Sequence, residues 1–132
     1  MMKKNHNLHI LPFGLALLIS QPVLARELLD QEKEIIANVV KDELLDSESA
    51  KFRWVPLPKY GIEVYCGLVN SKNSFGGYAG WAPYVVSPVW FKQTMKGASV
   101  IGVGTSNDDS PATIAVMATC AKHGYTELFL AK

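Results

Sequence analysis

The 132-residue sequence predicts a small α+β domain, in which an antiparallel sheet of three to five strands carries an N-terminal and a C-terminal helix. Three observations predict this class. Apolar residues recur at helical spacing over residues 27–45, several strand-like runs fill residues 51–104, and residues 107–124 carry clear helix start and stop signals. The order helix, strands, helix favours packing of both helices on one face of the sheet.

Residues 1–25 are interpreted as a secretory signal peptide. Two lysines precede the apolar run ILPFGLALLI, and Val23 and Ala25 are the small residues expected before cleavage after Ala25. A proline and a glycine interrupt the run, which makes a membrane span a poor alternative, although an uncleaved anchor stays open. We therefore expect a single small domain over residues 26–132, located in the periplasm or secreted, with no membrane span in the mature form.

Charge and cysteine content narrow the possible functions. The chain has 13 Lys and Arg against 12 Asp and Glu, and two of the lysines lie in the predicted signal peptide. A nearly neutral domain lacks the basic surface of a nucleic-acid-binding protein, so no nucleic-acid partner is expected. In an oxidising compartment, Cys66 and Cys120 are predicted to form a disulfide; two buried thiols that never meet are the alternative.

The predicted elements follow in chain order. The first helix spans residues 27–45, and short strands are expected at 51–57, 61–70, 83–91 and 98–104, with Pro88 breaking or edging the third. The second helix begins with Asp109 or Ser110 as N-cap and Pro111 at its first position, and ends at Gly124. The tail 125–132 can add a last short strand.

The sequence contains no convincing catalytic or metal-binding set. His123 is the single histidine of the predicted mature domain, and a role at the helix C-terminus is favoured over catalysis. Gly102 and Gly104 before a helix are a weak phosphate-binding signal, and Asn107, Asp108 and Asp109 do not have the spacing of an EF-hand loop. We therefore predict no catalytic residues, no metal and no cofactor.

The best candidate for function is the loop NSKNSFGGYAGW, residues 70–81. Its glycines permit positive φ and its asparagines can accept hydrogen bonds from turn backbone groups. Its three aromatic rings can either fold back onto the core, which is at least as expected for Phe75 and Trp81, or stay exposed, as expected for Tyr78. The candidate binding residues are Asn70, Lys72, Asn73, Ser74, Phe75, Tyr78 and Trp81.

Two segments carry a family resemblance. DSESAKFR (46–53) and CGLVNSKNSFGGYAG (66–80) resemble a pattern found in small exported or lipid-anchored bacterial and phage-borne proteins, D-P-x-S-A-K-F-R followed by C-G-x-V-N-x-K-N-S-F-G-G-Y-x-G. Ser47 departs from the usual proline of the first motif. That family is uncharacterised, so the resemblance implies a similar fold and a shared importance of the loop, and names no activity.

Three functions compete for this loop. The favoured hypothesis is a non-catalytic binding or accessory protein that contacts another envelope or secreted protein, such as a secretion-system component or an enzyme it inhibits. A second is a small cell-envelope hydrolase that uses Lys72, Asn73, Ser74 and Tyr78 as polar groups. A third is a purely structural role with buried rings. The exposure of the three rings distinguishes the first hypothesis from the third.

Overall fold

The structure, a computed structural model, describes Met2, Gly14, Ala16 and residues 25–58 and 62–126. Four strands pair in the order β1-β2-β3-β4, with every neighbouring pair antiparallel. This architecture confirms the predicted α+β class. In chain order the elements are α1 (Asp30–Lys41), the short 3-10 helix η1 (Ser47–Ser49), β1 (Lys51–Arg53), β2 (Tyr65–Asn70), β3 (Ala82–Phe91), β4 (Thr94–Val103) and α2 (Pro111–Lys122).

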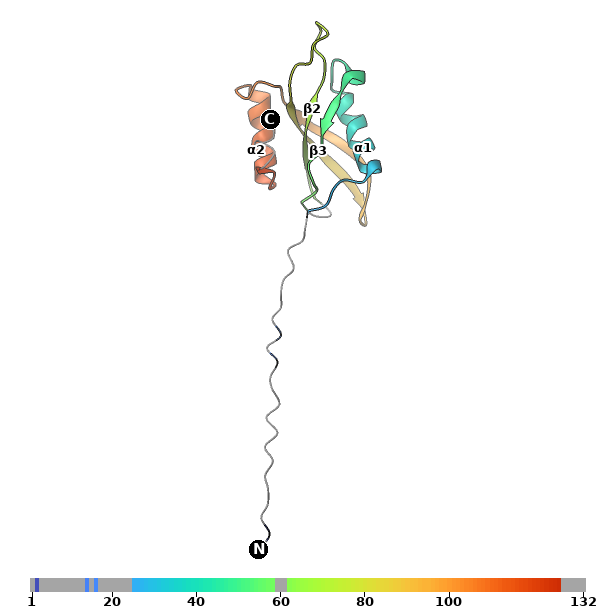
Figure 1. Cartoon of the computed structure of the whole chain (residues 1–132), viewed down its shortest axis with the longest axis vertical. Helices are drawn as coiled ribbons and strands as arrows, with labels where there is room; N and C mark the ends of the chain where they lie inside the picture. The colour runs from blue at the N-terminus through green and yellow to red at the C-terminus, as the bar shows by residue number, and fades with distance from the viewer. Residues whose placement is uncertain (1, 3–13, 15, 17–24, 59–61, 127–132) are drawn as a thin grey trace.

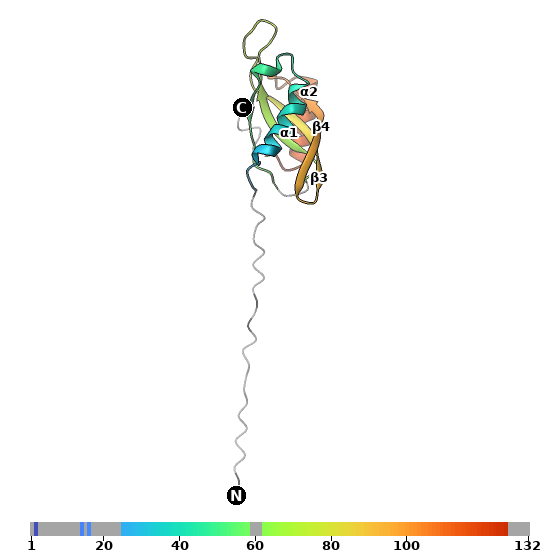
Figure 2. The same cartoon turned by 90° about the vertical axis from the view of Figure 1, so that its right-hand side faces the viewer.

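The two helices cover opposite faces of the sheet. Helix α1 packs mainly against β4, whereas α2 packs against β3 and β4. Figure 1 shows the strands between α2 on the left and α1 on the right, and in Figure 2 α1 lies in front of the strands with α2 behind them. The prediction that both helices share one face is therefore wrong. All residues of 65–69 in β2 and of 83–86 in β3 are buried, as in strands covered on both faces.

Most predicted elements are present with shifted ends. Helix α1 is shorter than predicted and ends at Lys41, one residue after Val40, which is its last buried residue. Strand β4 begins at Thr94, four residues before its predicted start. β3 is not broken at Pro88. From Ser87 onward β3 pairs only with β4, so the β2 side of this part of the strand is an edge. A proline is tolerated there because no neighbouring strand on that side needs its missing N–H group.

Several sequence predictions fall outside the described residues. These are nearly all of the signal peptide, the turn at residues 59–61 and the last part of the tail, residues 127–132. Among the described residues, no helix has both the length and the apolar character needed to cross a membrane. Export and cleavage after Ala25 stay predictions.

Three buried tyrosines connect the layers of the core. Tyr65 Oη donates to Val55 O at 2.7 Å and accepts from Val55 N at 2.8 Å, which attaches the segment after β1 to the sheet. Tyr125 Oη donates to Val64 O at 2.9 Å. Tyr84 Oη has no hydrogen-bond partner among the described residues. Burial raises the pKa of each phenol above its ordinary value of 10.0.

Helix α2 is positioned by local signals and by one covalent bond. Ser110 Oγ accepts from Thr113 N at 3.2 Å, Pro111 occupies the first turn, and Gly124 takes φ +90° just past the helix. Cys66 of β2 and Cys120 of α2 form a disulfide with a Cα–Cα distance of 6.0 Å. The predicted disulfide and helix ends are therefore confirmed, with Ser110 rather than Asp109 as N-cap.

A partly buried ion pair at the start of α1 predicts an acid-sensitive contribution to stability. Arg26 Nη1 and Nη2 donate to the Glu32 carboxylate at 2.8 and 2.6 Å, and Leu29 N donates to the same group at 2.9 Å. The Arg26 hydrogen bonds are the main cause that holds the pKa of Glu32 below its ordinary value of 4.5. Because the pKa of Glu32 is lower in the folded than in the unfolded state, its ionised form stabilises the fold above about pH 4.5. This stabilisation is lost as the pH falls through the pKa of Glu32 in the folded protein.

We expect Glu32→Gln to lower the free energy of unfolding by about 2 kcal/mol at pH 7, because Arg26 loses its carboxylate partner. Urea titrations at several pH values check this. The difference between wild type and variant should shrink below about pH 4, where protonation removes the same charge from the wild type. A constant difference down to pH 3 would contradict the assignment of this charge to the ion pair.

Candidate functional site: the arm between β2 and β3

Residues 70–81, here called the arm, project beyond the sheet as an extension of the β2–β3 hairpin (Figure 1). Beyond Val69 and Ala82, the last residue pair of β2 and β3, the outgoing and returning segments of the arm stay hydrogen-bonded to each other. Ala79 N donates to Ser71 O at 3.0 Å, Asn73 N donates to Gly77 O at 2.8 Å, and Lys72 and Tyr78 form an isolated bridge. The arm is therefore a narrow hydrogen-bonded ladder and not an open loop.

The asparagines and glycines shape this ladder as the sequence predicts. At the tip, Asn73 Oδ1 accepts from Phe75 N at 3.0 Å and from Gly77 N at 3.2 Å, while Gly76 takes φ +79°. At the base, Asn70 Oδ1 accepts from Gly80 N at 3.0 Å. Two side-chain amides thus satisfy backbone donors at both ends of the arm.

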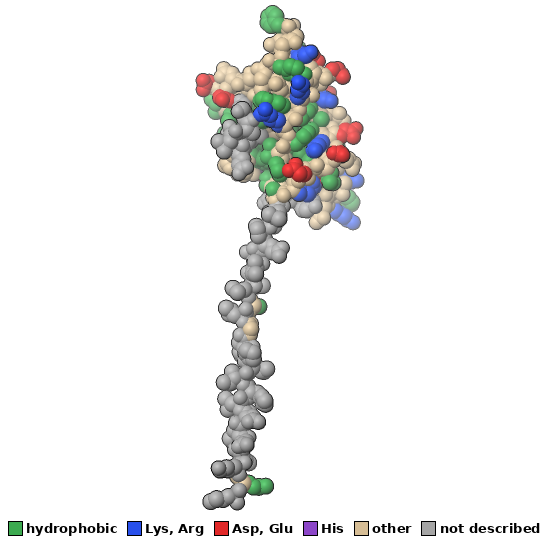
Figure 3. All heavy atoms as spheres, in the orientation of Figure 1, with side chains coloured by type: hydrophobic (Ala, Val, Ile, Leu, Met, Phe, Trp, Pro, Cys, Tyr) green, Lys and Arg blue, Asp and Glu red, His purple; other side chains and the backbone are tan. Residues whose placement is uncertain are grey.

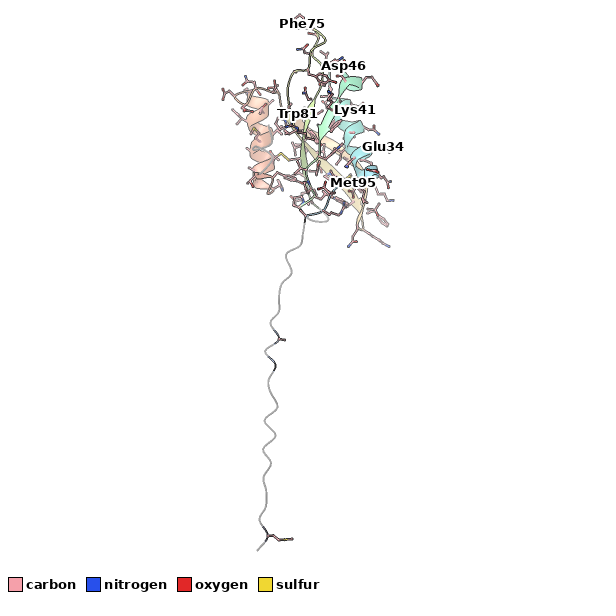
Figure 4. The ribbon with its side chains drawn as sticks, viewed as in Figure 1. Glu34, Lys41, Asp46, Phe75, Trp81 and Met95 are labelled. Carbon is pink, nitrogen blue, oxygen red and sulfur yellow. A yellow bond between two sulfur atoms is a disulfide. The ribbon has the colours of Figure 1, made fainter. Side chains whose placement is uncertain are left out.

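The three rings of the arm have different environments. Phe75 is 95% exposed at the tip and does not fold back onto the core (Figure 4). Tyr78, halfway along the returning chain, is 42% exposed. Trp81, at the base, is half-buried against the core, and the Arg53 guanidinium lies 4.2 Å from its ring centroid. Only Trp81 therefore has the packing role that the structural hypothesis requires of all three rings.

The arm is supported from the side by η1 and β1. Ser49 Oγ accepts from Lys72 N at 2.8 Å, and Tyr78 Oη donates to Ser49 O at 3.1 Å. The ammonium groups of Lys51 and Lys72 lie 4.3 and 5.7 Å from the Tyr78 ring centroid. Sequence reasoning did not assign Ser49 and Lys51 to the site. Both belong to the first of the two motifs quoted above, and the structure places that motif against the second.

The polar residues of the hydrolase hypothesis do not converge. Ser74 is exposed at the tip, whereas the Lys72 ammonium lies toward the Tyr78 ring, halfway along the arm. Among the described residues, cavities lie at the base of the arm, beside α2 and near Tyr125, and neither Ser74 nor Lys72 lines these. Within the described residues no three His, Cys, Asp or Glu side chains are grouped to hold a metal ion. The tip of the arm projects away from the rest of the fold (Figure 1).

No family model matches the sequence, and no curated protein or solved structure matches it either. The motif resemblance described above stays a prediction. The geometry of the arm and the chemistry of its side chains are therefore the basis on which a function can be proposed.

Proposed function

We propose that this protein is a small exported, non-catalytic binding or accessory protein that contacts its partner through the arm. The observation that carries the proposal is the position of Phe75, whose ring is 95% exposed at the tip of a hydrogen-bonded projection. Burying a phenylalanine side chain contributes about 2 kcal/mol. Because the arm leaves that ring in water, the gain becomes available only when a partner covers it.

The hydrogen-bonded backbone of the arm should strengthen binding through the Phe75 ring. The hydrogen bonds from Asn73 and the contacts with Ser49 fix the backbone before binding, so little conformational entropy is lost when a partner docks. Lys51 and Lys72 add positive charge beside the Tyr78 ring. Figure 3 shows hydrophobic atoms at the projecting tip and several basic side chains on the face below it. The partner should therefore offer an apolar pocket with an acidic rim.

The disulfide and the predicted signal peptide support export, and with it the expected class of partner. A disulfide such as Cys66–Cys120 persists in oxidising compartments, which is compatible with a secreted or periplasmic protein. The predicted signal peptide points to the same location. We therefore expect the partner to be another envelope or secreted protein.

The test is affinity capture from envelope extract with wild type and two variants. Phe75→Ala should reduce partner recovery at least about tenfold, as for a central interface residue, without changing the melting temperature. Phe91→Ala is the matched control, because Phe91 is also an exposed phenylalanine but lies in the β3–β4 hairpin, away from the arm. Equal recovery of the same proteins by Phe75→Ala and wild type would exclude the arm as the contact surface.

A further inference from the structure

A second unpartnered apolar feature lies on the α2 face of the sheet. It is an open groove of about 200 Å³ between α2 and β4, and Thr119 is its single polar lining side chain. Ile101, one of its walls, is exposed, and small residues of α2 form the opposite wall. Its lining includes Ile101 and Gly102 of β4 and Ala112, Ala115, Val116 and Thr119 of α2.

We propose that Phe75 of one copy of this protein inserts into the groove between α2 and β4 of a second copy. The proposal rests on the proposed function, because it uses the arm as contact surface and names the partner as the chain itself. A single aromatic side chain is comparable in size with the groove, and both surfaces are apolar and exposed in one chain.

The residues that flank each surface suit this insertion. Gly76 and Gly77 follow Phe75, so no bulky side chain beside the ring hinders its entry. In the groove, Ala112 and Ala115 leave space above the sheet that larger residues on α2 would fill. The floor is closed, since a Cβ built on Gly102 would already meet Val116 Cγ2 at 3.1 Å. A ring would therefore rest on the sheet and be covered at its sides by Ile101 and α2.

Charge complementarity supports the same pairing. Lys72 is the single charged residue of the arm. The groove reaches Ala112 in the first turn of α2, and the exposed Asp109 lies just before Ser110, the N-cap of that helix. A basic arm that approaches this end of the groove would meet the Asp109 carboxylate. Association should therefore weaken as salt concentration rises, in addition to its dependence on Phe75.

The sheet edges offer a less suitable surface for a second copy. β1 has three residues, of which Lys51 and Arg53 are charged, and β4 carries Lys96 and two register shifts in its pairing with β3. Short, charged or irregular edges are the features by which proteins avoid strand-to-strand association. The arm and the groove remain the complementary pair among the described residues.

Sedimentation velocity of the purified, disulfide-intact protein over a range of concentrations tests the proposal. Wild type should self-associate, and Phe75→Ala and Ala115→Leu should each raise the dissociation constant at least about tenfold. Ala118→Leu is the matched control, because Ala118 is also exposed on α2 but does not line the groove. A mixture of Phe75→Ala and Ala115→Leu should recover one-to-one association, since one variant keeps the groove and the other keeps the ring.

Two results would overturn the inference. Wild type could stay monomeric up to about 1 mM, or Ala115→Leu could associate as tightly as wild type. If either result is found while Phe75→Ala still loses its captured protein, the inference fails and the proposed function stands. If Phe75→Ala changes neither self-association nor capture, both fail.

Discussion

Gly67→Ala is expected to destabilise the domain strongly and to lower its melting temperature by more than about 10 °C. Gly67 lies in the centre of β2, directly opposite Tyr84 of β3. A Cβ at this position would overlap Tyr84 Oη and lie 2.6 Å from Cζ of the same ring. The ring is fully buried and contacts the Phe52 and Tyr65 rings, so it has no space into which it can move. Thermal unfolding monitored by circular dichroism measures the effect.

Two further variants show whether the Tyr84 ring is the cause. Gly97→Ala changes a glycine in β4 that has open space around its Cβ position, so it should leave the melting temperature nearly unchanged. Adding Tyr84→Phe to Gly67→Ala removes the overlapping oxygen but leaves the ring carbons, so it should restore part of the loss. The single variant Tyr84→Phe should cost little, because the hydroxyl has no partner among the described residues. A Gly67→Ala protein as stable as wild type would contradict this packing.

Local signals made much of the fold predictable. The start of α2 follows from Ser110 and Pro111, and its end from Gly124, because caps and positive φ depend on neighbouring residues only. The disulfide followed from two cysteines and an inferred oxidising compartment. The hydrogen bonds of Asn70 and Asn73 also lie within the arm itself and follow the ordinary preferences of turn residues.

Long-range packing decided what the sequence did not reveal. Which face of the sheet each helix covers depends on the packing of the whole sheet. The unbroken apolar runs of β2 and β3 nevertheless indicated that both faces of these strands are covered. The early start of β4 depends on the tight β3–β4 hairpin, where Lys92 takes φ +56° without the glycine or asparagine typical of such turns. No local pattern distinguishes the exposed Phe75 from the packed Trp81.

The contact between the two sequence motifs, residues 46–53 and 66–80, also could not be predicted from neighbouring residues alone. Ser49 and Tyr78 are 29 residues apart, and their hydrogen bond exists because β1 pairs with β2 beside the arm. The pairing places Lys51 opposite Asn70, the first residue of the arm. The resemblance joined both segments in one pattern, and this register supplies a physical reason: η1 and β1 support the arm from the side.

Removing the disulfide is expected to lower the free energy of unfolding by about 4 kcal/mol, because Cys66 and Cys120 are 54 residues apart and close a long loop in the unfolded chain. Cys66→Ala with Cys120→Ala, compared with wild type in urea, measures this loss. A reducing agent should destabilise wild type by a similar amount. It should leave the cysteine-free variant unchanged, which controls for other effects of the reagent.

In addition to this global loss of stability, removal of the disulfide should loosen the C-terminal end of α2. Thr113 holds the start of the helix by donating to Thr105 O at 3.0 Å and accepting from Thr105 N at 2.8 Å, and these bonds survive reduction. Near the other end, Cys120 is the last buried residue of the helix. Hydrogen exchange of the variant at neutral pH should therefore accelerate most at residues 117–122, whereas exchange in β2 and β3 should rise only by the global loss of stability. Uniform acceleration over α2 and the sheet would show instead that the bond stabilises the whole domain without anchoring the helix.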